Sequence, residues 1–220
     1  MSGDHPPLTG DDARRWAADL GDEHTPATDE PPASRFAWCV TGSGHFLEES
    51  LAIALRLPNV DLYLSAAADE VLPLYGWRLE ALRERFRVFR DKSASSVPVG
   101  RLYAEAYHTV VVAPATSNTV AKCAFGLSDS LPTNMFAQAG KLGVPSIVFA
   151  CDTEPVVVTK APRSHASEWL TLRPRRVELD NVERLRGFEH CAVVDTPEAL
   201  EAALAARLAT LNLAWNASSS

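Results

Sequence analysis

The chain has 220 residues and a formal net charge of −7, with 21 Lys and Arg residues against 28 Asp and Glu residues. An acidic chain without a basic block is unsuited to binding nucleic acid or an anionic membrane surface, and no apolar run reaches membrane-spanning length. The length allows one α/β domain with a sizeable core.

The chain starts with residues 1–34, which are rich in Asp, Glu, Pro and Thr. This composition predicts a flexible N-terminal extension, or an arm that docks onto another subunit. The segment lacks the basic start and apolar core of a signal peptide, so we expect a cytoplasmic protein. The ordered domain is predicted to span residues 35–213, and residues 214–220 are predicted to form a disordered tail.

Short apolar runs rich in β-branched and aromatic residues alternate with segments of helical apolar spacing along the domain. The short runs predict strands at 36–40, 60–65, 86–90 (a more exposed strand), 109–112, 145–150 and 191–194. The helical spacing predicts helices at 46–56, 66–75, 79–85, 102–107, 120–125, 132–142 and 197–211. Residues 151–176 are predicted to be irregular. This alternation indicates an α/β fold with a parallel sheet.

Ligands of such sheets bind at the carboxyl ends of the strands, near the point where the strand order switches. Four segments follow predicted strand ends: the turn 41–45, Ser65, the turn 116–119 and the segment 151–155. We therefore expect these four segments to form one site.

The stretch 113–122 reads Ala-Pro-Ala-Thr-Ser-Asn-Thr-Val-Ala-Lys and connects a buried strand to a helix. The free N–H groups and partial positive charge of a helix N-terminus suit an anion or a flat polar ring. Capping would explain any one of the polar residues 116–119, but four in a row exceed what a cap needs. The stretch therefore predicts a ligand site.

The other polar residues at strand ends leave alternatives open. The turn Thr41-Gly42-Ser43-Gly44 is not GxGxxG; it suits one phosphate, or it is a tight turn that needs a positive φ at glycine. Ser65 by itself indicates a helix cap, but with Ser43 it could bind the same phosphate.

Several charged residues and cysteines have simple structural interpretations. Asp129 is a possible helix cap, and His45 a surface or cap histidine. Asp152 is a solvated loop acid or a catalytic group. The arginines at 173, 175 and 176 favour a solvated face over a clamp for an acidic substrate. No CxxC motif occurs, so no metal is expected, and Cys39 and Cys123 are predicted to be buried thiols.

Residues 113–122, together with Gly-Leu-Ser-Asp-Ser-Leu at 126–131 and Thr-Asn at 133–134, resemble the signature of the FMN-binding flavoprotein superfamily. This superfamily includes cysteine decarboxylases and flavin prenyltransferases, and the resemblance covers about residues 35–210. It implies a Rossmann-like, doubly wound parallel sheet in a single domain, with FMN at a subunit interface. It also implies a homo-oligomer built of trimers, which can form shells of twelve or twenty-four subunits. The implied cofactor-binding residues are Gly42, Ser43, Gly44, His45, Ser65, Pro114, Ala115, Thr116, Ser117, Asn118, Thr119, Asp129 and Asn134.

Within this superfamily, residues 100–103, 158–160 and 175–185 are similar to the archaeoflavoprotein and dihydromethanopterin reductase branch. That similarity implies reduction of a dihydropterin to tetrahydromethanopterin by ping-pong electron transfer through FMN. The electron donor would be an NAD(P)H-linked reductase or a ferredoxin. The implied catalytic residues are Asn118, against the flavin ring, and Asp152, facing the substrate.

The cysteine decarboxylases differ from this chain at two positions. Their catalytic His would fall at Gly100, and their Pro-x-Met-Asn segment is replaced by Ala-Cys-Asp-Thr at 150–153. Decarboxylation is therefore disfavoured. The main alternative is an electron carrier that passes electrons from a ferredoxin or reductase to a protein partner, and an FMN-dependent cysteine decarboxylase is the less favoured one.

Overall fold

The computed structural model describes residues 34–91, 97–162 and 168–216, and its centre is a parallel sheet of six strands. The strand order is β3-β2-β1-β4-β5-β8, and every neighbouring pair is parallel. The strands are β1 (Arg35–Val40), β2 (Val60–Leu64), β3 (Arg87–Arg90), β4 (Tyr107–Ala115), β5 (Ser146–Ala150) and β8 (Cys191–Val194). The chain builds outward from β1 to β3 and then returns to place β4 on the other side of β1. The topological switch point therefore lies between β1 and β4.

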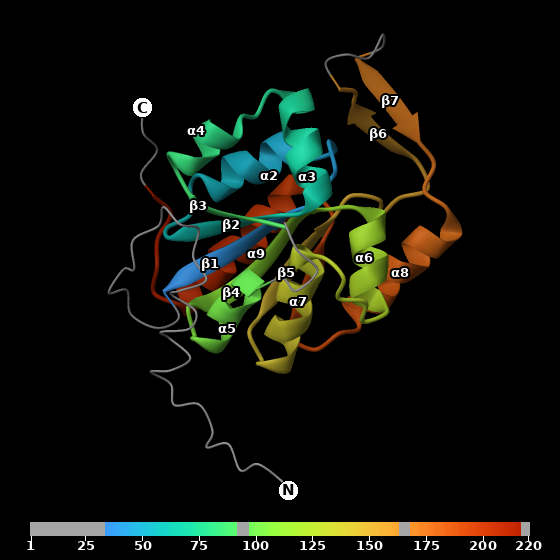
Figure 1. Cartoon of the computed structure of the whole chain (residues 1–220). Helices are drawn as coiled ribbons and strands as arrows, with labels where there is room; N and C mark the ends of the chain where they lie inside the picture. Colours follow the sequence, from blue (N-terminus) through green and yellow to red (C-terminus); the bar gives the residue numbers. More distant parts are fainter. Residues whose placement is uncertain (1–33, 92–96, 163–167, 217–220) are drawn as a thin grey trace, which may run out of the picture.

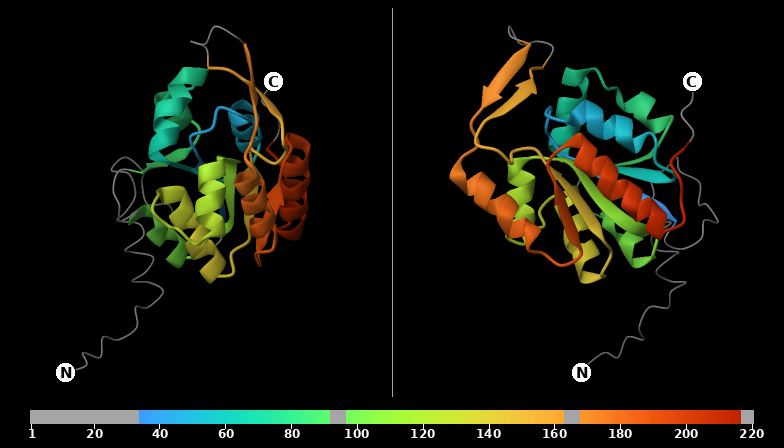
Figure 2. Two further views of the ribbon diagram at one scale, coloured as in Figure 1. Left: turned by 90° about the vertical axis from the view of Figure 1, so that its right-hand side faces the viewer. Right: turned by 180° about the vertical axis from the view of Figure 1, so that it is seen from behind.

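Helices cover both faces of this sheet (Figures 1 and 2). One face packs against α2 (Leu47–Ala54), α3 (Ala66–Val71), α4 (Leu79–Arg83) and α9 (Pro197–Thr210). The other face packs against α5 (Gly100–Tyr103), α6 (Ser117–Ala124), α7 (Leu131–Lys141) and α8 (Arg176–Arg186). Two short 3-10 helices, η1 (Leu72–Tyr75) and η2 (Val97–Val99), complete the described elements. This is a Rossmann-like doubly wound α/β domain, as predicted.

The two cores follow from side-chain alternation along the strands. In β1, Phe36 and Trp38 belong to the core under α2 and α9, whereas Ala37 and Cys39 belong to the core under α6 and α7. All four side chains are completely buried. Successive strand residues point to opposite faces, so a strand covered on both sides must be apolar throughout.

One prediction about individual elements was wrong, and one helix was missed. Residues 151–176 are not uniformly irregular: β6 (Val157–Lys160) and β7 (Trp169–Leu172) form an antiparallel hairpin that projects from the body of the molecule (Figure 1). The helix α8 was not predicted. The third strand, β3, is more exposed than β1 and β2, as predicted: it lies at the edge of the sheet, and Arg87 and Arg90 at its two ends are only partly buried.

The two ends of the predicted domain can be compared with the structure only in part. Most of the expected extension, residues 1–33, and residues 217–220 of the expected tail lie outside the described residues. Within that tail, the Trp215 ring lies under the Arg56 guanidinium, 4.8 Å from ring centroid to Cζ. Asn216 donates to the carbonyl oxygens of Arg56 and Leu57 at 2.7 and 2.8 Å.

Across the described part of the chain, no helix is long and apolar enough to cross a membrane.

A buried carboxylate joins four elements at the amino end of the sheet. Asp61 of β2 is fully buried, and its Oδ1 accepts from Arg35 Nε at 2.8 Å. Its Oδ2 accepts from the Tyr107 hydroxyl at 2.7 Å. Arg87 and Arg101 place guanidinium nitrogens 3.5 and 3.8 Å from the same carboxylate. This network ties β1, β3, β4 and α5 to β2.

Candidate functional site at the switch point

The carboxyl ends of β1 and β4 are held together by one threonine. Thr41 Oγ1 donates to the carbonyl oxygen of Pro114 at 2.7 Å and accepts from the backbone N–H of Thr116 at 3.0 Å. The Thr41 N–H also points to the Pro114 carbonyl oxygen, at 3.3 Å. The turn after β1 is thereby fixed against the start of α6, as the shared sheet edge predicts.

The polar residues at the start of α6 have two different tasks. Thr116 is the N-cap and accepts from the Thr119 N–H, and the two threonine hydroxyls lie 3.0 Å apart. Capping therefore accounts for the side chains of Thr116 and Thr119. Ser117 and Asn118 occupy the first turn, where they are half-buried and exposed respectively. Capping does not account for these two side chains, and the first-turn N–H groups provide a partial positive charge beside them.

The glycines after β1 are explained by close approach and not by backbone conformation. Gly42 and Gly44 are not among the residues with positive φ, so a turn that needs a positive φ at glycine is not the reason for them. A Cβ at Gly42 would lie 2.6 Å from the Ala67 Cβ, and a Cβ at Gly44 would lie 1.9 Å from the Tyr75 hydroxyl. The turn therefore runs directly against α3 and η1.

Ser65 brings the end of β2 to the same edge. Its hydroxyl accepts from the Ala68 N–H at 3.0 Å and caps α3, and its own N–H donates to the Val40 carbonyl oxygen at 3.0 Å. The capping interpretation of Ser65 is thus correct, and the residue also lies beside the end of β1. The structure consequently brings together all four segments that the sequence placed at strand ends.

The segment after β5 contributes Cys151 and Asp152. The Cys151 thiol donates to Ser43 Oγ at 3.3 Å, which links this segment to the turn after β1. The Ser117 hydroxyl makes a short hydrogen bond to Asp152 Oδ2, which links it to α6. Burial lowers the pKa of His45, and the carboxylates of Asp152 and Glu49 oppose that effect. His45 is therefore expected to be largely neutral at pH 7.

The four cysteines are free thiols, and Cys39 and Cys123 are buried as predicted. Burial raises the pKa of Cys123, Cys151 and Cys191 to about 12. At pH 8 only about one such thiol in 10⁴ is ionised. We therefore expect iodoacetamide to leave Cys151 unmodified in the folded protein, while the urea-unfolded chain is alkylated within minutes. Peptide mass spectrometry measures this, and equal rates in the two states would contradict the burial-based account.

Asp129 and Asn134 support the link between α6 and α7. Asp129 is not the cap of α7, since Ser130 is, and its Oδ1 lies 2.9 Å from Lys122 Nζ. The Asn134 amide donates to the carbonyl oxygens of Ser128 and Ser130 at 2.9 and 3.1 Å. These contacts give both residues a structural task at the connection between α6 and α7.

The arginines near residue 175 form a solvated face, as favoured from the sequence. Arg175 and Arg176 are highly exposed and pair with Glu178 and Asp180 of their own helix.

The chain belongs to the flavoprotein family, whose family model, described as "Flavoprotein", matches residues 24–211. The structure is similar to that of DmrB from Burkholderia xenovorans in complex with FMN, described as a cubic protein cage for redox transfer. That protein is 65% identical, with a TM-score of 0.77 over 84% of this chain and 99% of the other.

Two relatives come from Methanocaldococcus jannaschii and Methanosarcina mazei. An uncharacterized protein of Methanocaldococcus jannaschii is 40% identical over 76% of this chain and 92% of its own length. A dihydromethanopterin reductase (acceptor) of Methanosarcina mazei is 41% identical over 58% of this chain. The match spans 59% of the length of that reductase.

Three residues that hold the segments of the site together, Thr41, Cys151 and Tyr75, were not predicted as site residues. Thr41 and Cys151 both sit directly after strands, which was the available signal, but their roles depend on which strands are neighbours. Tyr75 is packed against Gly44 from η1, and its hydroxyl lies 3.4 Å from the carbonyl oxygen of Lys160 in β6. Nothing in the sequence indicates that approach.

Proposed function

We propose that this chain binds FMN at the switch point and reduces dihydromethanopterin to tetrahydromethanopterin. The observation that carries the proposal is the joined edge of β1 and β4, where Thr41 fixes the Gly42-Ser43-Gly44 turn against the N-terminus of α6. The 65% identity to a protein solved with FMN and the 41% identity to a dihydromethanopterin reductase support it.

The residues at this edge fit FMN. The turn at 42–44 is held close to α3 and η1 by its two glycines, and Ser43, Ser65 and Thr116 would supply hydroxyls to a phosphate and a ribityl chain at this edge. We assign Pro114, Ala115 and His45 to the adjoining wall, while Thr119 belongs to the cap of α6, and Asp129 and Asn134 hold the connection between α6 and α7. The Asn118 amide and the free first-turn N–H groups of α6 would favour negative charge on the flavin ring. The Ser117 hydroxyl already donates to Asp152, so Ser117 would contribute through its backbone N–H. When bound, FMN supplies the two-electron redox chemistry.

The protein's own part in the reaction is to orient the pterin. Reduction of a dihydropterin requires two electrons and two protons. The Asp152 carboxylate is half-buried, is held by the Ser117 hydroxyl, and is suited to accept from pterin N–H groups. Electrons would come from an NAD(P)H-linked reductase or a ferredoxin in a separate half-reaction. The active form would be a homo-oligomer built of trimers, in line with the cage described for DmrB.

The experiment that tests the function follows oxidation of the bound cofactor without oxygen. The purified protein is expected to be yellow and to release FMN, not FAD, in acid. After reduction, its flavin absorbance should return faster with dihydromethanopterin than in buffer alone. A colourless protein that FMN does not reconstitute would overturn the cofactor assignment. Reoxidation no faster than in buffer would overturn the reductase and favour the electron carrier.

Asp152→Asn is expected to lower kcat/KM for dihydropterin about 10- to 100-fold, because a charged acceptor at the substrate becomes neutral. FMN content should be unchanged, since the amide keeps the size of the side chain. Glu154→Gln is the matched control two residues away, at an exposed position, and should retain full activity. Equal activity of both variants would remove Asp152 from the substrate site.

A further inference from the structure

A cavity of about 360 Å³ lies away from the switch-point site. Its walls come from the end of α6, the inner side of α7, the start of β5 and the loop before β8. The eight residues of α6 separate the two regions, a length of about 12 Å at 1.5 Å per residue. The cavity is within the volume range of small-molecule sites.

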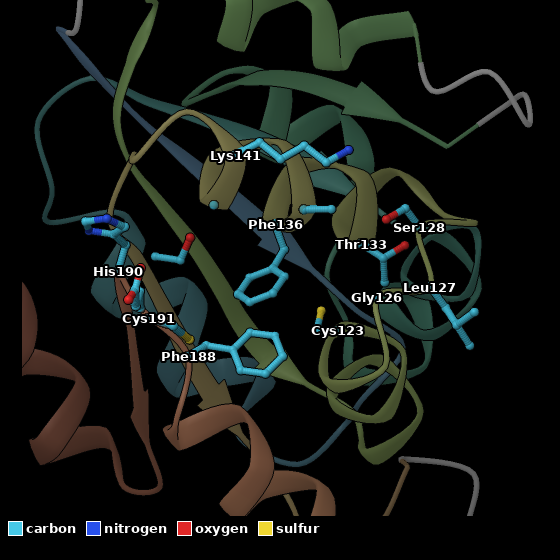
Figure 3. Close-up of a pocket in the computed structure, with 14 residues that line it drawn as sticks. Cys123, Gly126, Leu127, Ser128, Thr133, Phe136, Lys141, Phe188, His190 and Cys191 are labelled. Atoms are coloured by element: carbon cyan, nitrogen blue, oxygen red, sulfur yellow. The ribbon is translucent and has the colours of Figure 1, made fainter.

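Two phenylalanine rings and two thiols give this cavity an apolar interior. Figure 3 shows the rings of Phe136 and Phe188 pointing toward one another across it, with the Cys123 and Cys191 sulfurs nearby. Burial raises the pKa of both thiols to about 12, so these groups carry no charge. Phe188 is 37% exposed although its ring faces the cavity. Facing aromatic rings favour a flat aromatic guest.

One polar group in the cavity lacks a partner. Ser146 is only 3% exposed, and its hydroxyl oxygen is buried without a hydrogen bond among the described residues. Its backbone N–H is already used by the His190 carbonyl oxygen at 2.7 Å. Buried hydroxyls almost always have a partner, and a small movement of the cavity wall would let this one donate to an acceptor atom of a ligand.

The charged residues that line the cavity include both signs of charge. Lys141 and Glu189 both contribute to the lining, one positive and one negative, and His190 follows Glu189 in the chain. An ion of either sign would therefore meet a like charge as well as an opposite one. The lining suits an uncharged ligand.

We propose that this cavity binds an uncharged planar heteroaromatic molecule of one or two fused rings. The ring lies between Phe136 and Phe188, and a ring nitrogen or carbonyl oxygen accepts from Ser146 Oγ. The proposal does not depend on the function of the switch-point site.

Quinoline is a suitable probe, because it is flat, uncharged at pH 8 and carries one acceptor nitrogen. Calorimetric titration of the FMN-loaded full chain is expected to show saturable binding. Phe188→Ala should weaken binding about 10-fold, and Ser146→Ala about 5-fold, as the loss of one neutral hydrogen bond predicts. Ser146→Ala should fold normally, since it removes a hydroxyl that has no partner.

Phe125→Ala is the control: Phe125 is 59% exposed, stacks under Arg184 and is not part of the lining. Its quinoline affinity should equal that of the parent chain. Absence of saturable binding at millimolar quinoline, or equal effects of the Phe125 and Phe188 variants, would overturn the proposal. A side chain of a neighbouring subunit filling the cavity in the assembled protein would also overturn it.

Discussion

Replacing Gly42 with alanine is expected to lower the affinity for FMN about 10- to 100-fold. The new Cβ would lie 2.6 Å from the Ala67 Cβ and 3.2 Å from the Ala67 carbonyl carbon, and the latter is backbone that cannot rotate away. The turn cannot retreat either, because Thr41 is bound to both Pro114 and Thr116. The strain is therefore expected to displace the turn at 42–44, where the phosphate would bind. A shift of this kind by about an ångström is enough to lose well-placed hydrogen bonds.

Flavin fluorescence during equilibrium titration with FMN measures this effect. Gly140→Ala is the matched control, since the same methyl group is added in α7 with no atom within 4 Å. That variant should bind FMN as the parent chain does and be slightly more stable, because alanine is the better helix former. Unchanged FMN affinity of the Gly42 variant would show that the cofactor lies elsewhere than against this turn.

All six strands of the sheet were predicted, and four of them (β1, β2, β4 and β5) are buried along their whole length. Parallel strands that are buried on both faces consist of continuous apolar runs, which are visible in the sequence. The β6–β7 hairpin and the helix α8 could not be predicted from the sequence. In β6 only Val157 and Thr159 are buried, while Val158 and Lys160 are exposed, so the run is short and mixed. In α8 the buried face has two apolar residues, Val182 and Leu185, among charged neighbours. Periodicity is weak when so little of an element faces a core.

The sequence predicted which segments form the site, but it did not predict the contacts between these segments. Each segment follows a strand, and the carboxyl ends of parallel strands share one edge. The pairing of Thr41 with Pro114, 73 positions away in the chain, depends on β4 being inserted beside β1. The requirement for glycine at 42 depends on the approach of Ala67. Such long-range proximity leaves no local pattern, so a residue such as Thr41 is inconspicuous until the strand order is known.

Replacing Asp61 with alanine is expected to destabilise the folded protein by about 3–5 kcal/mol. Asp61 is the carboxylate that Arg35 and Tyr107 bind at 2.8 and 2.7 Å, and Arg87 and Arg101 also face it. The side chains of the three arginines are 10–13% exposed. Without the carboxylate, three neighbouring positive charges repel each other in a region where water cannot screen them.

The midpoint of urea unfolding, compared between FMN-loaded proteins, reports this loss, and the melting temperature should fall by about 10 °C. Glu201→Ala is the matched control, because Glu201 pairs with Arg56 at 2.7 Å on the surface, where both side chains are more than 40% exposed. Such a pair contributes at most about 1 kcal/mol. If both variants lose the same small amount, the arginines must rearrange into water, and the buried network would not hold the amino end of the sheet together. A large loss confined to the Asp61 variant is expected, since its carboxylate ties four other elements to β2, whereas Glu201 ties only the segment after α2 to α9.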